Sequence, residues 1–252
     1  MQGNPPRVTE IAPDIFQISI FAPEINLQFN AFLVRDDEPL LFHTLFRRWV
    51  PLMREGIARL LDPARLRWIS FSHFEMDECG ALNEWLAEAP RAEAAHNFVG
   101  VNVNLHDYSS RPARVLMPED RLVTGKYCFR YIHTPQLPHG WDAGVMFEEK
   151  TRTLFCSDLF HHGGDPEPIT EQDVLGRVRA ELTAYQAGPL ANYVPFTQHT
   201  ERILHGLAEL KPRTIAAQHG SAYAGDGERA LRGLAQVMRE VLGKAASVTS
   251  AP

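Results

Sequence analysis

A histidine and several acidic residues alternate along one short segment of the sequence, and their spacing could place them around a metal ion. The segment is Ser72-His73-Phe74-Glu75-Met76-Asp77-Glu78-Cys79-Gly80. Alternate residues of an extended chain point the same way, so the side chains of His73, Glu75 and Asp77 can converge. Asp77 and Glu78 then begin a helix, where carboxylates are favoured. An N-capped helix with solvated acidic residues therefore remains an alternative for this segment considered alone.

Three more residues of metal-ligand type stand at the ends of apolar segments. His139 lies between a proline and a glycine, Asp158 follows the apolar run Leu154–Ser157, and His219 follows Thr214–Ala217. A buried acid without a partner costs several kcal/mol, so Asp158 requires one. Considered singly, these residues also fit a surface-loop histidine, a turn acid and a core histidine. Together with the His73 segment, they favour one shared site that holds two metal ions.

The elements that must position these residues can be predicted from hydrophobic periodicity. Strands are expected directly before His73, Asp158 and His219, and a helix directly after Glu75. Two strand-rich halves, each followed by helices, predict two sheets covered by helices. Strands are expected at 15–20, 30–34, 40–43, 66–72, 127–133, 145–149, 153–157 and 214–217, and helices at 50–61, from about 77, within 170–210 and at 228–242.

Composition narrows the class of protein. The 252 residues carry a net charge of −6 without a basic stripe, so nucleic acid and anionic membrane surfaces are not expected partners. No apolar run is long enough to cross a bilayer, and the first residues lack the apolar core of a signal peptide, which predicts a cytoplasmic protein. The three cysteines, at 79, 128 and 156, do not suggest a disulfide framework. Residues 1–252 are expected to form one domain.

The order of the candidate ligands resembles that of a known family. His-x-Glu-x-Asp, then a loop histidine, then an aspartate after a strand, then His-Gly near the C-terminus, is similar to the diiron domain of flavodiiron proteins. It resembles still more closely the stand-alone oxygen-binding diiron proteins of the metallo-β-lactamase superfamily. The similarity runs from Asn30-Ala31-Phe32-Leu33 to Gln218-His219-Gly220. It implies an α/β fold, the metallo-β-lactamase-type four-layer αββα sandwich. No flavodoxin-like domain is expected.

The resemblance also implies a role for each ligand. His73, Glu75 and His139 would hold one metal, Asp77 and His219 would hold the other, and Asp158 would bridge the two. Glu78 stands where the flavodiiron pattern has a histidine. It either binds the second metal or turns away and leaves an open coordination position.

Three histidines and three carboxylates suit iron or manganese better than zinc, so two iron ions are predicted, with zinc or manganese as alternatives. The resemblance implies binding or reduction of dioxygen or nitric oxide, by a sensor or by an oxidoreductase with an external flavin or electron-transfer protein as donor, and a homodimer. The rival is a dinuclear zinc hydrolase that uses a metal-bound hydroxide. Glu75 argues against it, because the superfamily's hydrolases typically have His-x-His-x-Asp-His. A metal-binding structural or partner-binding protein without catalysis is a third alternative.

Several further residues are secondary candidates. His43 could donate a hydrogen bond to a ligand carboxylate, although an ordinary buried, hydrogen-bonded histidine is an equal alternative. His161 or His162 could line the site. Trp141, Tyr193 and Phe196 could form the walls of an apolar gas pocket, although core packing explains each aromatic residue as well.

Overall fold

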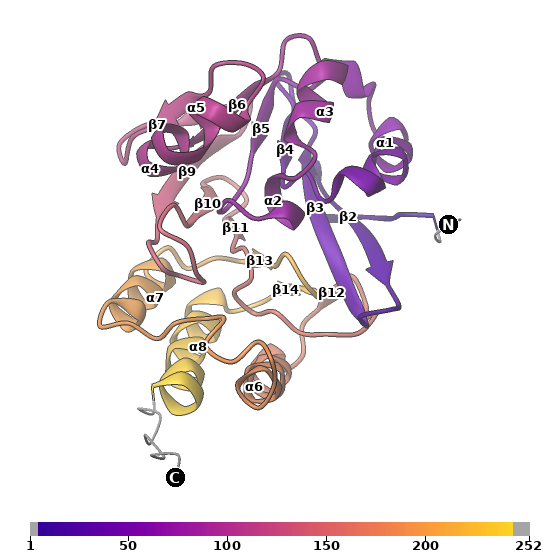
Figure 1. The fold of residues 1–252 in the computed structure, drawn as a ribbon. Coiled ribbons are helices and arrows are strands. Elements are labelled where there is room, and N and C mark those ends of the chain that lie inside the picture. Colours follow the sequence, from indigo (N-terminus) through magenta and orange to yellow (C-terminus); the bar gives the residue numbers. More distant parts are fainter. Residues whose placement is uncertain (1–4, 244–252) are drawn as a thin grey trace.

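The computed structural model describes residues 5–243, and these residues form two seven-stranded sheets packed face to face (Figure 1). The first sheet comes entirely from the first part of the chain, with its strands in sequence order. Strands β1 to β4 are antiparallel, whereas β4 to β7 run parallel. The strands of this sheet are β1 (Arg7–Ala12), β2 (Ile15–Ala22), β3 (Leu27–Val34), β4 (Leu40–Phe42), β5 (Trp68–Ser70), β6 (Glu93–Asn97) and β7 (Arg114–Leu116).

The second sheet uses the rest of the chain, in the order β12-β14-β13-β11-β10-β9-β8. Its central strands β11 and β13 run parallel, so the segments that follow them leave the sheet at the same edge. The strands are β8 (Leu122–Val123), β9 (Cys128–His133), β10 (Gly144–Glu148), β11 (Thr153–Phe155), β12 (Ile169–Thr170), β13 (Thr214–Ala216) and β14 (Ala222–Ala224).

Helices cover the outer faces of both sheets, as Figure 1 shows. Helices α1 (Val50–Ala58) and α3 (Leu82–Glu88) lie on the first sheet, and α6 (Val174–Gln186), α7 (Thr200–Ala208) and α8 (Gly227–Leu242) lie on the second. The short helix α2 (Met76–Cys79) lies at the junction of the sheets. Remaining helical segments are the 3₁₀ turns Arg47–Trp49 and Pro63–Arg65, α4 (Phe98–Gly100), a π-helical turn (Val101–Leu105) and α5 (His106–Tyr108).

Three hydrophobic clusters separate the four layers. One joins α1 and α3 to the first sheet, and another joins α6, α7 and α8 to the second. The third lies between the sheets, where Phe32 and Phe42 of the first sheet meet Phe129 and Phe155 of the second. This arrangement confirms the predicted αββα sandwich.

Most predicted elements are present, with bounds that differ by a few residues. The predicted strand 66–72 is shorter, because residues 71–75 already form the loop that carries His73. The helical region 170–210 is divided into α6 and α7. Strands β1, β6, β7, β8, β12 and β14 and the helical segment 98–108 were not predicted individually. Within residues 5–243 no helix is long and apolar enough to span a bilayer. None of the three cysteines is disulfide-bonded.

Candidate metal centre

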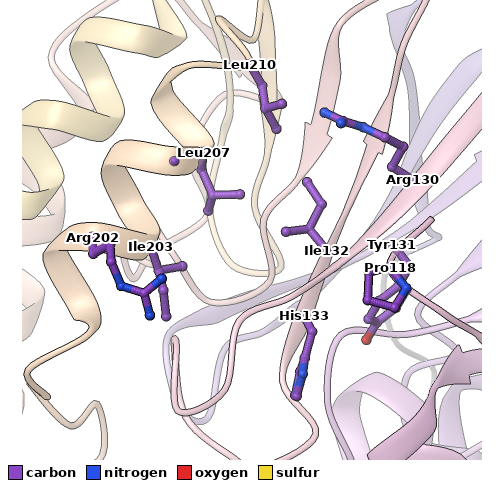
Figure 2. Close-up of a pocket in the computed structure, with 10 residues that line it drawn as sticks. Pro118, Arg130, Tyr131, Ile132, His133, Arg202, Ile203, Leu207 and Leu210 are labelled. Carbon is purple, nitrogen blue, oxygen red and sulfur yellow. The ribbon is translucent and has the colours of Figure 1, made fainter.

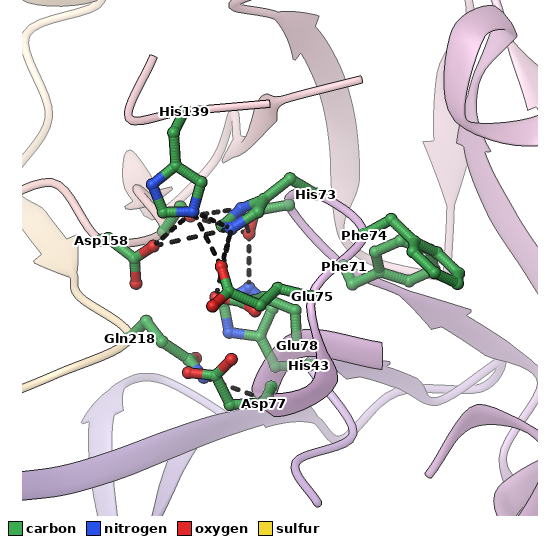
Figure 3. A network of polar contacts seen from close by, with 12 residues as sticks. His43, Phe71, His73, Phe74, Glu75, Asp77, Glu78, His139, Asp158 and Gln218 are labelled. Atoms are coloured by element: carbon green, nitrogen blue, oxygen red, sulfur yellow. Dashed lines mark hydrogen bonds and ion pairs between the residues drawn. The ribbon is translucent and has the colours of Figure 1, made fainter. Parts of the chain in front are cut away.

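Both sheets deliver candidate ligands to one common edge, shown in Figure 3. His73 follows β5, Glu75 is the N-cap residue of α2, and Asp77 and Glu78 lie within α2. The second sheet contributes His139 from the β9–β10 loop, Asp158 after β11 and His219 after β13. The six predicted ligands therefore meet, although His219 is separated from His73 by more than half of the chain.

His73, Glu75 and His139 form the first group of candidate ligands. The Nε2 atoms of His73 and His139 are only 2.6 Å apart. Glu75 Oε2 lies 3.2 Å from His73 Nε2 and 2.9 Å from His139 Nε2. One atom from each of these residues could bind a single ion. A cation between the two histidines would accept both nitrogen lone pairs, which face each other here.

His219 and Asp77 form the second group, and Asp158 connects it to the first. His219 Nε2 lies 3.3 Å from Asp77 Oδ2 and 3.3 Å from Asp158 Oδ1. The other oxygen of the same carboxylate, Asp158 Oδ2, lies 3.7 Å from His73 Nε2 and 3.6 Å from His139 Nε2. One carboxylate therefore faces two sets of histidines with its two different oxygens, which is the geometry of a bridging ligand.

Glu78 points into the site between the two groups. Its side chain is buried, and neither of its oxygens has a hydrogen-bond partner among the described residues. Glu78 Oε1 lies 3.8 Å from His73 Nε2, and an oxygen of Glu78 can share an ion with Glu75 and Asp77. Burial, together with the charges of Asp77 and Asp158, raises the pKa of Glu78 well above its ordinary value. An unpartnered carboxylate in this position is what a cation would satisfy.

His161 lies beside the second group, whereas His162 points away from it. An atom each of Asp158, His161 and His219 could share one ion. Nε2 of His161 accepts or donates a hydrogen bond with the Tyr185 hydroxyl at 2.7 Å, and its Nδ1 is buried without a partner in the described chain. Both nitrogens of His162 are already used, by the carbonyl of Phe160 and the N–H of Ser221.

Residues that sequence reasoning did not single out hold His73 in place. Ser72 Oγ lies 3.0 Å and Ser157 Oγ 3.3 Å from His73 Nδ1, and Ser157 donates to Ser72 at 2.7 Å. His43 contacts Ser72 through Nε2 at 3.1 Å, so it supports His73 through a serine. Burial lowers the pKa of His43 to about 3. His43 and Ser157 both have positive φ, 67° and 59°, where the chain turns sharply out of a strand.

A buried polar layer positions His219. Its Nδ1 donates to the backbone carbonyl of Gln28 at 2.9 Å, which directs Nε2 toward Asp77 and Asp158. The amides of Gln28 and Asn30 donate to the carbonyl of Gly220, the residue after His219. In the sequence, Gln28 and Asn30 are polar residues inside an otherwise apolar strand, and this pattern could have predicted the layer.

Asp142 ties the loop of His139 to the segment of His73. Its Oδ2 accepts from the backbone N–H of Phe74 at 3.0 Å and from Asn104 at 3.2 Å. Its backbone carbonyl accepts from Asn97 at 2.6 Å. The two loops that carry the first ligand group are thereby fixed relative to each other.

The pKa values of Glu75, Asp158 and His219 are shifted toward their charged forms. Hydrogen bonds from His139 and then His73 lower the pKa of Glu75 to about 2. Burial opposes the charge of His219, but its hydrogen bonds to Asp158 and Asp77 outweigh burial and raise its pKa to about 10. The hydrogen bond with His219 outweighs the burial of Asp158 and lowers the pKa of Asp158 strongly. A metal would therefore replace a proton on His219.

The three aromatic residues expected around a gas pocket have different places. The ring of Tyr193 lies 4.3 Å from that of His139, and its hydroxyl is 3.5 Å from Asp158 Oδ2. Burial, followed by the charge of Asp158, raises the Tyr193 pKa far above its ordinary value. Trp141 is 69% exposed beside Phe74 and Asp142, and Phe196 packs within the outer cluster near Gly243. Of the three, Tyr193 alone contacts the candidate ligands within the described chain.

Comparison with known proteins places the chain among longer relatives. Rubredoxin-oxygen oxidoreductase of Megalodesulfovibrio gigas is 25% identical over 201 residues, 78% of this chain and 49% of that protein. Nitric oxide reductase of Moorella thermoacetica is 25% identical over 239 residues, 90% of this chain and 57% of that protein. The solved structure of rubredoxin oxygen:oxidoreductase from Desulfovibrio gigas is 20% identical, with a TM-score of 0.77 over 92% of this chain and 61% of that one. The chain thus spans about half the length of the relatives that it matches.

A match to a family model shows which family this chain belongs to. The model described as "ODP family beta lactamase" matches residues 27–220, which include both candidate ligand groups. Independently of the family model, the solved structure described above has the same fold as this chain. This protein therefore belongs to the ODP family of beta-lactamase-fold proteins.

Proposed function

We propose that this protein holds two iron ions and uses them to bind or reduce dioxygen or nitric oxide. The observation that carries the proposal is the position of Asp158, whose two oxygens face the His73–His139 pair and His219 separately. His73, Glu75 and His139 would hold one ion, and Asp77 and His219 the other. Mixed imidazole and carboxylate ligands suit iron.

Glu78 and His161 would complete the site. Glu78 lies within reach of both groups and adds a carboxylate to the set, which favours more highly charged ions. His161 would add a second histidine nitrogen around the second ion, beside Asp158 and His219. When bound, two iron ions with open coordination positions supply a binding place and electrons for a diatomic gas.

The residues of the chain would bind, orient and protect the reacting gas. The Glu75 side chain is 42% exposed, so the first group is the side of the site that small molecules reach from solvent. Tyr193 covers His139 and places a hydroxyl next to Asp158. Because this hydroxyl stays protonated, it can donate a hydrogen bond to a ligand in the site.

The partners and surroundings follow from the same proposal. The two relatives are named as a rubredoxin-oxygen oxidoreductase and a nitric oxide reductase, and both extend well beyond the matched region. We therefore place the electron donor, a flavin or electron-transfer protein, outside the described residues. We further propose that the chain is one metallo-β-lactamase-fold domain, acts in the cytoplasm and forms a homodimer.

The test combines metal analysis with gas binding. Protein purified from iron-supplied cells should contain about two iron atoms per chain, as the two ligand groups imply. After anaerobic reduction, dioxygen or nitric oxide should change its visible absorption, and Asp158→Ala should remove the change. Repeated preparations with two zinc ions, no iron, and turnover of lactones, thioesters or phosphodiesters would refute the proposal in favour of a hydrolase.

A further inference from the structure

A groove separates helix α7 from strand β9 on the outer side of the second sheet, away from the candidate ligands. Its cavity measures about 440 Å³. Ile203 and Leu207 of α7 face Ile132 of β9, and Leu210 closes one end (Figure 2). The guanidinium groups of Arg130 and Arg202 lie toward opposite ends of this β9–α7 groove.

The strand that borders the groove has an open edge. Thr134 N donates to Ala143 O at one end of β9, and Glu149 N donates to Cys128 O at the other. Backbone bonds in an antiparallel pair use every second residue, so Arg130 and Ile132 also bond to β10. The backbone groups of Tyr131 and His133 therefore point to the other edge. There the pairing with β8 ends at Phe129.

A proline explains why this edge stays open. Pro118, on the segment that leads into β8, also lines the groove. Proline has no N–H, so it cannot extend the ladder beside His133, the residue that it would face if the β8–β9 register continued. Among the described residues, no strand pairs with β9 beyond Phe129 on this side.

The charge of the groove is positive. Arg202 forms no ion pair with any residue in the range 5–243, and no carboxylate lines the groove. Arg130 Nε lies 3.4 Å from Glu149 Oε1, but the same oxygen also pairs with Arg121 at 3.0 Å. One carboxylate therefore serves two arginines, and both ends of the groove can accept an anion.

We propose that the β9–α7 groove binds an extended peptide segment of a partner protein, in which an apolar residue has an acidic residue two positions before it and another two positions after it. The peptide adds as a strand to the open edge of β9, so its backbone pairs with Tyr131 and His133. These three side chains share one face of the peptide strand, so the apolar one packs between Ile132 and Leu207 and the carboxylates meet Arg130 and Arg202. This proposal does not depend on the metals.

A glycine makes room for this peptide. Gly206 lies on α7 at the groove, and a Cβ at this position would meet no atom within 4 Å. A larger side chain there therefore fills the groove without disturbing the fold. Gly206→Leu should block the peptide, whereas Gly206→Ala should leave space for it.

The experiment uses the whole protein and a defined set of fluorescent seven-residue peptides, measured by polarisation. In the set, Val, Leu or Phe stands at the fourth position and Glu, Gln or Lys at the second and sixth, with Thr at the other positions. We expect Glu peptides to bind in preference to Lys peptides, and Arg202→Glu and Gly206→Leu to weaken binding by at least about tenfold. Two control variants should bind like the wild type: Gly206→Ala, and Arg91→Glu in the exposed turn before β6.

Methylation of the peptide backbone distinguishes binding as an added strand from binding by charge attraction alone. N-methyl groups on one set of alternate residues should abolish binding, and those on the other set should not, because only one edge of the peptide faces β9. Several outcomes would overturn the proposal: no Glu peptide binding saturably, equal effects of both methylated sets, equal binding by decanoate alone, or self-association of the protein that Gly206→Leu abolishes.

Discussion

His73 and His139 point their Nε2 atoms at each other across 2.6 Å, and they do so from different sheets. Only one proton can lie between two such nitrogens, whereas a metal ion can bind both. The contact therefore links metal binding to the docking of the two sheets.

Metal binding should stabilise the protein through this contact. At a free metal concentration of 100 times Kd, linkage predicts a gain of about 2.7 kcal/mol in the free energy of unfolding. Anaerobic titration with ferrous iron, followed by thermal unfolding, should show this gain in the wild type. His139→Ala should lose most of it, and His199→Ala, an exposed histidine outside the site, should keep it. An equal gain in both variants would show that the metal does not bind to the His73–His139 pair.

Glu78→Gln should have opposite effects with and without metal. Burial raises the pKa of the unpartnered Glu78 well above its ordinary value and so favours the neutral form in the metal-free protein, where the amide should cost little stability. With metal bound, loss of the carboxylate should weaken binding and lower the melting temperature. The melting temperatures in chelator and in iron measure both effects.

Glu148 provides the matched control for Glu78. It is also buried, but it accepts hydrogen bonds from Lys150 N, Thr151 N and the Thr151 hydroxyl. Glu148→Gln should destabilise the metal-free protein and leave metal affinity unchanged. If Glu78→Gln behaves in the same way as Glu148→Gln, Glu78 is not a ligand.

Ser157→Ala should reduce metal affinity about tenfold to hundredfold, the usual effect of removing a residue that orients a ligand. Ser157 contacts His73 Nδ1 and donates to Ser72. The control is Ser70→Ala, because Ser70 is equally buried but donates to the Ala95 carbonyl away from the ligands. Competition with a metal indicator gives both affinities, and equal values for the two variants would contradict the orienting role.

Protonation of His96 should make the free energy of unfolding depend on pH. Burial lowers its pKa to about 3, while the unfolded chain keeps about 6.5. Between these values the unfolded state binds the extra proton, so stability falls as pH falls from about 6.5 to about 3, by at most about 1.4 kcal/mol per pH unit. Urea unfolding across this range should show a shallower slope for His96→Gln than for wild type. His106→Gln, which removes an exposed histidine, should retain the wild-type slope.

The sequence predicted that the candidate ligands His73, Asp158 and His219 come together because each of these three follows an apolar run that must form a buried strand. The ends of β5, β11 and β13 carry His73, Asp158 and His219, and the order of these residues matches a known family. Strand β6 (Glu93–Asn97) escaped prediction because it lacks β-branched residues and reads as polar.

The inward direction of Glu78 and the supports of His219 could not be predicted. A helical first turn allows an acid to face water or the interior, and only the packing of α2 against the second sheet decides between them. The Gln28 carbonyl that orients His219 comes from a strand nearly the whole chain away. Local periodicity contains no information on such a contact.

Separation of the two sheets along the chain also sets an order in time. Glu75 and Glu78 leave the ribosome with the first sheet, whereas Asp158 and His219 emerge with the second. A nascent chain would therefore carry half of the proposed metal site, with acidic residues open to any cation in the cell. The two proposed ions could be enclosed only after synthesis has passed β13, so metal selection would be a late event in the biogenesis of the protein.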